Sequence, residues 1–245
     1  MTTTPPFTGW PAAAPALLAA LAADNTEDAF AALRERYDAA VHGPTRALAA
    51  ALGDGFGAVR VLRPRVDRRF RPHAPPFRTD TGVVATTADG TPRSVVLSAT
   101  GLAVAVGTRR FDPGQLGRYR AAVGPVLAEL LTGLDGWERD PGDLLARVPR
   151  GHPPEHPHAD LLRLRGLQLA RSWPVDDELS TVGVLDRIRA AWTAAAPLAA
   201  WLDEHVGPPL PPPRAPRPPA PGPEAPVEGA QPATPRSAAS TTTTA

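Results

Sequence analysis

The segment Gly82–Thr108 reads GVVATTADGTPRSVVLSATGLAVAVGT and contains three short apolar runs. Each run is rich in valine or alanine and is bounded by turn-forming residues, a pattern typical of β-strands. Ala88-Asp89-Gly90 and Thr100-Gly101 lie between the runs and predict hairpin turns. We therefore predict an antiparallel meander with strands at Gly82–Thr87, Arg93–Ala99 and Leu102–Thr108.

The sequence before this meander has helical periodicity. Apolar residues from Phe30 to Val41 recur at three- and four-residue spacing, so they share one helix face. We predict a helix from about Thr26 to His42, interrupted by Gly43-Pro44. The apolar lead-in Phe7–Pro11 precedes the helices, and we expect its Phe and Trp to clasp the body of the domain.

Similar patterns follow the meander. Asp112-Pro113 is a suitable N-cap and first residue for a helix that we expect to run to about Leu131. We predict a short helix near Leu144–Val148 and a strand at Leu167–Trp173. A last helix is expected at Thr181–His205, with a kink at Pro197. These elements predict an α+β fold, in which N-terminal and C-terminal helices pack on an antiparallel sheet of about four to five strands.

The most highly charged part of the chain is Val59–Asp80, VRVLRPRVDRRFRPHAPPFRTD, which we call the arginine segment. It contains seven arginines but only two acidic residues, Asp67 and Asp80. Four prolines prevent it from forming one regular strand, because proline cannot donate a hydrogen bond to a β-ladder. We expect a strand followed by an exposed loop.

The composition excludes several classes of chemistry. The 245 residues carry a net charge of +1 and include no cysteine and no lysine, which rules out thiolate metal sites, cysteine catalysis and Schiff-base lysines. We see no secretory signal and no membrane-spanning run, so we expect a cytoplasmic protein that makes no membrane contact. Nothing indicates a cofactor, and we predict none.

The composition changes after Val206. Thirteen prolines lie between Pro208 and Pro235, and no apolar periodicity remains. We therefore predict one domain at 1–206 and a disordered Pro/Ala/Thr-rich tail at 207–245. The run PPLPPPRAPRPPAP is also typical of ligands for SH3-type grooves, which makes a protein-interaction module one alternative function.

Several separated motifs give the chain a resemblance to a known family. The lead-in FTGW, the spacing of Asn25, Phe30 and Tyr37, and the arginine segment are each similar to the bacterial DUF2461 family. In the arginine segment the matching positions are Arg63, Asp67, Arg69, Phe70, Pro76, Phe77, Arg78 and Thr79. The segment PRGHPPEHPHADLL, which contains Arg150 and His156, resembles another family motif. The resemblance implies a single α+β domain with no established activity. Residues 71–74 depart from the family's Ser-Lys-Asp-Lys loop, which implies a diverged member.

The leading functional hypothesis is a binding site for an anionic small molecule. A guanidinium group suits bidentate contacts with carboxylates and phosphates. Our candidate ligand-binding residues are Arg63, Asp67, Arg69, Arg78, Arg150 and His156. The alternative is an enzyme acting on a phosphorylated or carboxylated substrate, which requires Asp67 or His156 in a shared pocket.

The sequence argues against two further hypotheses, nucleic-acid binding and metal binding. Nucleic-acid binding would use the same arginines with Phe70 and Phe77 as stacking platforms, but the net charge of +1 and the lack of a known binding motif argue against it. His152, His156 and His158 carry metal-ligating atoms, but prolines separate them and no regular ligand spacing is present. We predict no metal site.

Overall fold

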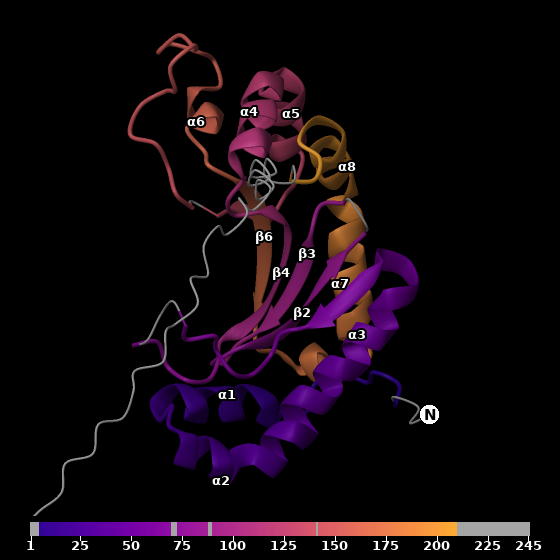
Figure 1. The fold of residues 1–245 in the computed structure, drawn as a ribbon. Coiled ribbons are helices and arrows are strands. Elements are labelled where there is room, and N and C mark those ends of the chain that lie inside the picture. The colour runs from indigo at the N-terminus through magenta and orange to yellow at the C-terminus, as the bar shows by residue number, and fades with distance from the viewer. Residues whose placement is uncertain (1–4, 70–72, 88–89, 141, 210–245) are drawn as a thin grey trace, which may run out of the picture. The chain divides into compact units, whose positions relative to one another are not determined.

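The computed structural model describes residues 5–69, 73–87, 90–140 and 142–209. Within these ranges, six strands form one antiparallel sheet in the order β1-β2-β3-β4-β6-β5 (Figure 1). The strands are β1 (Ala58–Val61), β2 (Thr81–Thr86), β3 (Arg93–Leu97), β4 (Gly101–Thr108), β5 (Glu138–Arg139) and β6 (Leu167–Pro174). The predicted α+β class and the meander β2-β3-β4 are confirmed. Strand β5 was not predicted, because two residues give no periodic signal.

The alternation of side chains sets the core face of the sheet. Val83 pairs with Val95, which pairs with Val104, and all three are fully buried. Their sequence neighbours point to the opposite face, where Val84, Ser94 and other small residues are only half-buried. The sheet therefore buries one face in the main core.

Helices cover that core face and both ends of the sheet. Helix α3 (Gly43–Phe56) packs on β1 and β2, and α7 (Gly183–Ala194) packs on β4 (Figure 1). At one end lie α1 (Ala13–Ala23) and α2 (Glu27–Tyr37), followed by the π-helix η1 (Asp38–His42). A second apolar cluster at the other end involves α4 (Pro113–Ala122), α5 (Pro125–Thr132), α6 (Ala159–Leu162) and α8 (Ala196–His205).

Several predicted helix boundaries were wrong. Gly43-Pro44 does not interrupt the run of helical residues, because α2, η1 and α3 follow one another directly. Pro44 lies in the first turn of α3, where its missing N–H is tolerated. The helix after Asp112 is instead broken at Gly124-Pro125 into α4 and α5. Residues 144–148 are not helical. The expected kink at Pro197 is a complete break between α7 and α8.

The N-terminal lead-in is clasped into the core as predicted. Trp10 is fully buried, its Nε1–H donates to Thr45 Oγ1 at 3.0 Å, and its backbone N–H donates to Leu179 O at 2.9 Å. Leu179 belongs to the 3₁₀ helix η2 (Asp177–Ser180). Gly9 has φ +104°, and a Cβ there would lie 2.6 Å from backbone atoms of residues 180 and 181. The lead-in therefore has a fixed position.

The folded domain continues past the predicted boundary at Val206. The Gln115 side-chain amide donates to Gly207 O, and Arg118 donates to the carbonyls of Val206 and Pro208. The rest of the predicted tail, from residue 210 onward, lies outside the described residues. Among the described helices, none is long and apolar enough to cross a bilayer.

Candidate functional site

The arginine segment forms a hairpin that extends the pairing of β1 with β2. Beyond β1, Leu62 N donates to Gly82 O, Arg78 N donates to Pro64 O, and Val66 N donates to Pro76 O, at 2.7–2.9 Å. We call residues 62–80 the arginine hairpin. The sequence predicted an exposed loop here, but the prolines contribute acceptors to this short ladder rather than preventing it. Residues 70–72, including Phe70, lie outside the described part.

Asn25 fastens this hairpin to the start of α2. Its Nδ2 donates to Phe77 O at 2.9 Å, and its Oδ1 accepts from Phe77 N at 3.0 Å. The Phe77 ring is buried and stacks on Phe30, with ring centroids 4.0 Å apart and an interplanar angle of 16°. The Asn25 amide and the Phe30–Phe77 ring pair thus both hold the hairpin against helix α2.

Most of the predicted arginine site is paired with nearby carboxylates. Arg69 binds Asp67 at 2.5 Å, and these hydrogen bonds hold the pKa of the exposed Asp67 carboxyl below its usual value. Arg78 binds Asp80 at 2.7 Å. Arg63 is exposed and, within the described residues, has no hydrogen bond or ion pair. Asp67 and Asp80 of the hairpin are therefore both paired with arginines of the same hairpin.

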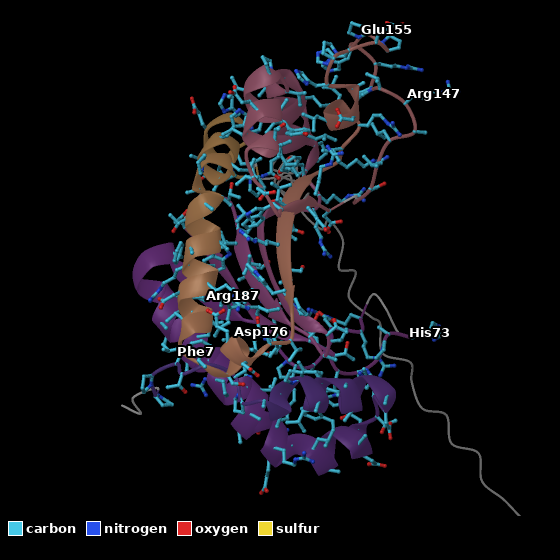
Figure 2. All side chains as sticks on the ribbon, turned by 180° about the vertical axis from the view of Figure 1, so that it is seen from behind. Phe7, His73, Arg147, Glu155, Asp176 and Arg187 are labelled. Carbon is cyan, nitrogen blue, oxygen red and sulfur yellow. The ribbon has the colours of Figure 1, made fainter. Side chains whose placement is uncertain are left out.

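The second group of predicted residues lies elsewhere. Figure 2 shows Glu155, the neighbour of His156, at one end of the molecule and well separated from His73 in the arginine hairpin. His156 Nδ1 accepts the backbone N–H of His158 at 3.1 Å, just before α6. Arg150 is exposed in the same stretch. The arrangement gives no support to acid–base chemistry that combines His156 with the hairpin.

The three histidines are neighbours, with ring centroids 6.2 Å apart for His152 and His156 and 5.8 Å apart for His156 and His158. Within the described residues, however, no three His, Asp or Glu side chains are arranged to hold a metal ion.

A surface cavity lies where α2 and η1 face the arginine hairpin, and we call it the cleft. It encloses about 280 Å³ and is lined by Phe30, Arg34, Asp38, His42, Pro64, Arg65 and Phe77. The cleft is therefore lined both by two helical segments and by a hairpin that lies later in the chain.

Two guanidinium groups lie on the aromatic pair that forms part of this lining. The Arg65 guanidinium carbon is 5.0 Å from the Phe77 ring centroid, and that of Arg34 is 5.8 Å from the Phe30 centroid. Both rings are buried, so each guanidinium contacts a fixed surface. The cleft thus combines an aromatic surface with two oriented cations.

Each of these cations already has a carboxylate partner. Arg65 binds Glu27 through two bonds of 2.7 and 2.9 Å, and Arg34 Nε lies 3.3 Å from Asp38. All four side chains are at least half exposed, so each pair contributes only about 0–1 kcal/mol. A guanidinium has five N–H donors, and these pairs leave some of them unused.

The helical part of the lining includes the π-helix η1. A π-turn widens a helix locally and is found disproportionately at functional sites. His42 is the last residue of η1, and its Nδ1 is buried without a hydrogen-bond partner among the described residues. Arg34, Asp38, His42 and Arg65, which line the cleft, are not among the residues that the sequence predicts as candidates. The register that places Arg65 opposite Phe77 identifies Arg65, and the packing of α2 and η1 against the hairpin identifies the other three. Single-sequence periodicity carries neither signal.

Comparison with protein families gives one result. Residues 13–201 match the sequence profile of DUF2461, described as a conserved hypothetical protein. The chain belongs to the DUF2461 family. No curated protein and no solved structure matches it. The match covers every residue of the cleft, and the resemblance inferred from the separated motifs is confirmed.

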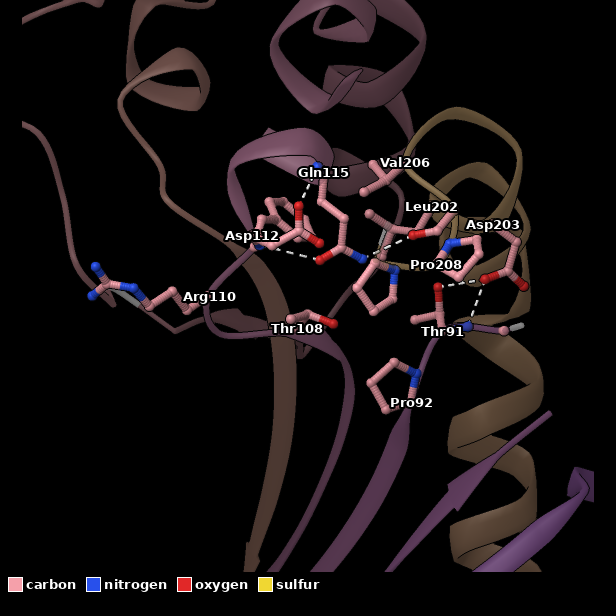
Figure 3. Close-up of a pocket in the computed structure, with 14 residues that line it drawn as sticks. Thr91, Pro92, Thr108, Arg110, Asp112, Gln115, Leu202, Asp203, Val206 and Pro208 are labelled. Carbon is pink, nitrogen blue, oxygen red and sulfur yellow. Dashed lines mark hydrogen bonds between the residues drawn. The ribbon is translucent and has the colours of Figure 1, made fainter. Parts of the chain in front are cut away.

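A larger cavity of this DUF2461 domain, about 430 Å³, lies between the start of α4 and the end of α8 (Figure 3). Its polar groups hold the fold together. Asp203 Oδ1 accepts the backbone N–H and the hydroxyl of Thr91, both at 2.6 Å. Asp112 caps α4, and Gln115 completes the capping box while also binding Gly207 O. Most of these groups bond to one another, so we regard this cavity as structural, but the buried Asp112 Oδ2 has no hydrogen-bond partner among the described residues.

Proposed function

We propose that this DUF2461 domain binds a small anionic molecule in the cleft, between Arg34 of α2 and Arg65 of the arginine hairpin. The observation that supports this proposal is the pair of guanidinium groups mounted on the stacked rings of Phe30 and Phe77. Planar guanidinium groups bind carboxylates and phosphates through paired N–H donors.

The fixed position of Arg65 favours this role. Its guanidinium lies against the Phe77 ring and is held by both oxygens of Glu27. A ligand anion can share the remaining donors or replace Glu27, because an exposed ion pair costs little to break. Less side-chain freedom is then lost on binding than for an unrestrained arginine.

Paired variants test the cleft directly. We expect Arg65→Gln to weaken binding of inorganic phosphate or acetate, and Glu27→Gln to strengthen it by removing the competing carboxylate. A hydrogen bond to a charged group contributes about 1.5–3 kcal/mol, so the loss in Arg65→Gln should be roughly 10- to 150-fold in Kd. Chemical-shift titration by NMR of the full chain measures these weak affinities.

Arg69→Gln is the matched control, because Arg69 is also an exposed arginine of the hairpin paired with a carboxylate. It should bind phosphate and acetate as the unmodified chain does. If Arg69→Gln loses binding while Arg65→Gln retains it, the ligand binds at the hairpin tip and the cleft proposal is wrong. If neither anion binds the unmodified chain, the domain is not an anion-binding domain of this kind.

A further inference from the structure

A second surface cavity lies beside the cleft, and the π-helix separates the two. It encloses about 300 Å³ and is lined by residues 5–9 of the N-terminal lead-in together with Asp38, Ala39, Gly43, Pro44 and Ala47. We call it the N-terminal cavity. Asp38 lines both cavities, so the two cavities meet at this residue.

The lining of the N-terminal cavity is mostly hydrocarbon. Prolines, alanines and Phe7 supply most of it, Thr8 and Asp38 are its polar side chains, and none of its residues is a cation. An anionic group therefore has no cationic partner in this lining, whereas an apolar group can be removed from water there. The two cavities differ in chemistry: one presents guanidinium groups and the other presents aliphatic surface.

The wall formed by the lead-in is preformed. Trp10 is anchored by its hydrogen bonds to Thr45 and Leu179, and Phe7 packs edge-on against Trp10 with centroids 5.2 Å apart. Gly9 fits against the backbone after η2, in a conformation with positive φ. A ligand would therefore not have to order this wall when it binds.

The carboxylate between the cavities is already neutralised. Asp38 pairs with Arg34 four residues earlier, at 3.3 Å. An apolar chain that crosses Asp38 would meet a paired carboxylate, which is less costly to cover than an isolated charge. Each cavity alone is at the small end of the range for ligand pockets, about 300–1,000 Å³, which favours a ligand that occupies both.

We propose that the ligand of this site is an amphiphilic anion, with its carboxylate or phosphate head in the cleft and its apolar chain lying over Asp38 in the N-terminal cavity. This inference rests on the proposed function, because the head group uses the same Arg34 and Arg65. It adds the chemical class of the ligand: a medium-chain acyl carboxylate or its phosphate counterpart.

Chain length is the first test. Acetate, hexanoate and octanoate share one head group, so NMR titration of the full chain compares their tails alone. Each methylene buried should tighten binding about fourfold. Octanoate should therefore bind about 15-fold more tightly than hexanoate if two further methylenes enter the cavity. Equal affinities for acetate and octanoate would overturn the amphiphile proposal and leave the anion-binding proposal standing.

A filling variant locates the tail. Ala39 is exposed and lines the N-terminal cavity, so Ala39→Trp should reduce octanoate affinity at least tenfold and leave acetate affinity unchanged. Ala32→Trp makes the same change at an exposed helical alanine that lines neither cavity, and it should change neither affinity. Arg65→Gln should weaken both ligands to the same degree. Tight octanoate binding that survives Ala39→Trp would place the tail elsewhere and refute the inference.

Discussion

Replacement of Thr45 by valine tests how the N-terminal lead-in is fastened to the core. Thr45 is fully buried, and its hydroxyl accepts from Trp10 Nε1 at 3.0 Å and donates to Val41 O at 2.7 Å. The same oxygen lies 3.2 Å from Thr81 Oγ1. Valine has nearly the same shape but no hydroxyl, so the variant removes hydrogen bonds without opening a cavity.

The expected cost comes from the indole left without a partner. Trp10 is fully buried, so its N–H cannot turn to water, and an unsatisfied buried donor costs about 1–3 kcal/mol. A loss of about 2 kcal/mol in a domain of this size lowers Tm by about 4–8 °C. The buried methyl that valine adds in place of the hydroxyl opposes this loss only in part.

Urea-induced unfolding of the full chain, followed by circular dichroism, measures the free energy of unfolding. Thr45→Ser is the matched variant, since it keeps the hydroxyl and removes one methyl group, at a cost of about 1 kcal/mol. We expect the unmodified chain to be the most stable, the Thr45→Ser variant to be less stable and the Thr45→Val variant to be the least stable. If buried apolar area alone decided stability, Thr45→Val would be more stable than Thr45→Ser. A valine variant at least as stable as the unmodified chain would refute the reasoning.

The remaining predictions concern titration and backbone conformation. The chain has only two tyrosines, and burial raises the pKa of Tyr37 to about 12 and raises that of Tyr119 as well. Because an unfolded tyrosine has a pKa of about 10, the folded state keeps these protons longer, so stability should fall as pH rises from about 10 to about 12. Ultraviolet absorbance of tyrosinate should therefore appear only with unfolding in that range, and early ionisation of both rings would contradict it. Gly57 has φ +84° and a Cβ there would lie 2.6 Å from Thr86 O, so Gly57→Ala should cost about 1–3 kcal/mol in urea unfolding. Gly55→Ala has open space and should be neutral or stabilising by up to about 1 kcal/mol, and equal effects of the two changes would contradict this account.

The candidate site was only partly predictable from the sequence. Arginine density selected residues 59–80, which line one side of the cleft, and the separated motifs correctly indicated the DUF2461 family. Density did not distinguish Arg65, which faces the cleft, from Arg69, which is paired with Asp67 at the hairpin tip. That distinction depends on which residue lies opposite Phe77, and such a register is a long-range property.

Local signals determined much of the fold. The alternation in Leu102–Val106 and the turn residues beside it are consistent with one arrangement, a meander with one buried face, because the side-chain period of a strand is two. The capping box Asp112–Gln115 likewise fixes the start of α4 from neighbouring residues alone. Such features depend on atoms a few residues apart, so they can be predicted from the sequence itself.

Tertiary structure decided the rest. Asn25 reaches Phe77 across fifty-two residues, and Trp10 reaches Thr45 across thirty-five. Each of these outcomes depends on a partner that only the folded chain brings near, and packing against that partner outweighs local propensities of about 1 kcal/mol or less for most residues. The sequence alone therefore specified the meander β2-β3-β4 and the family, while the cleft exists only because the fold brings α2, the π-helix and the arginine hairpin together.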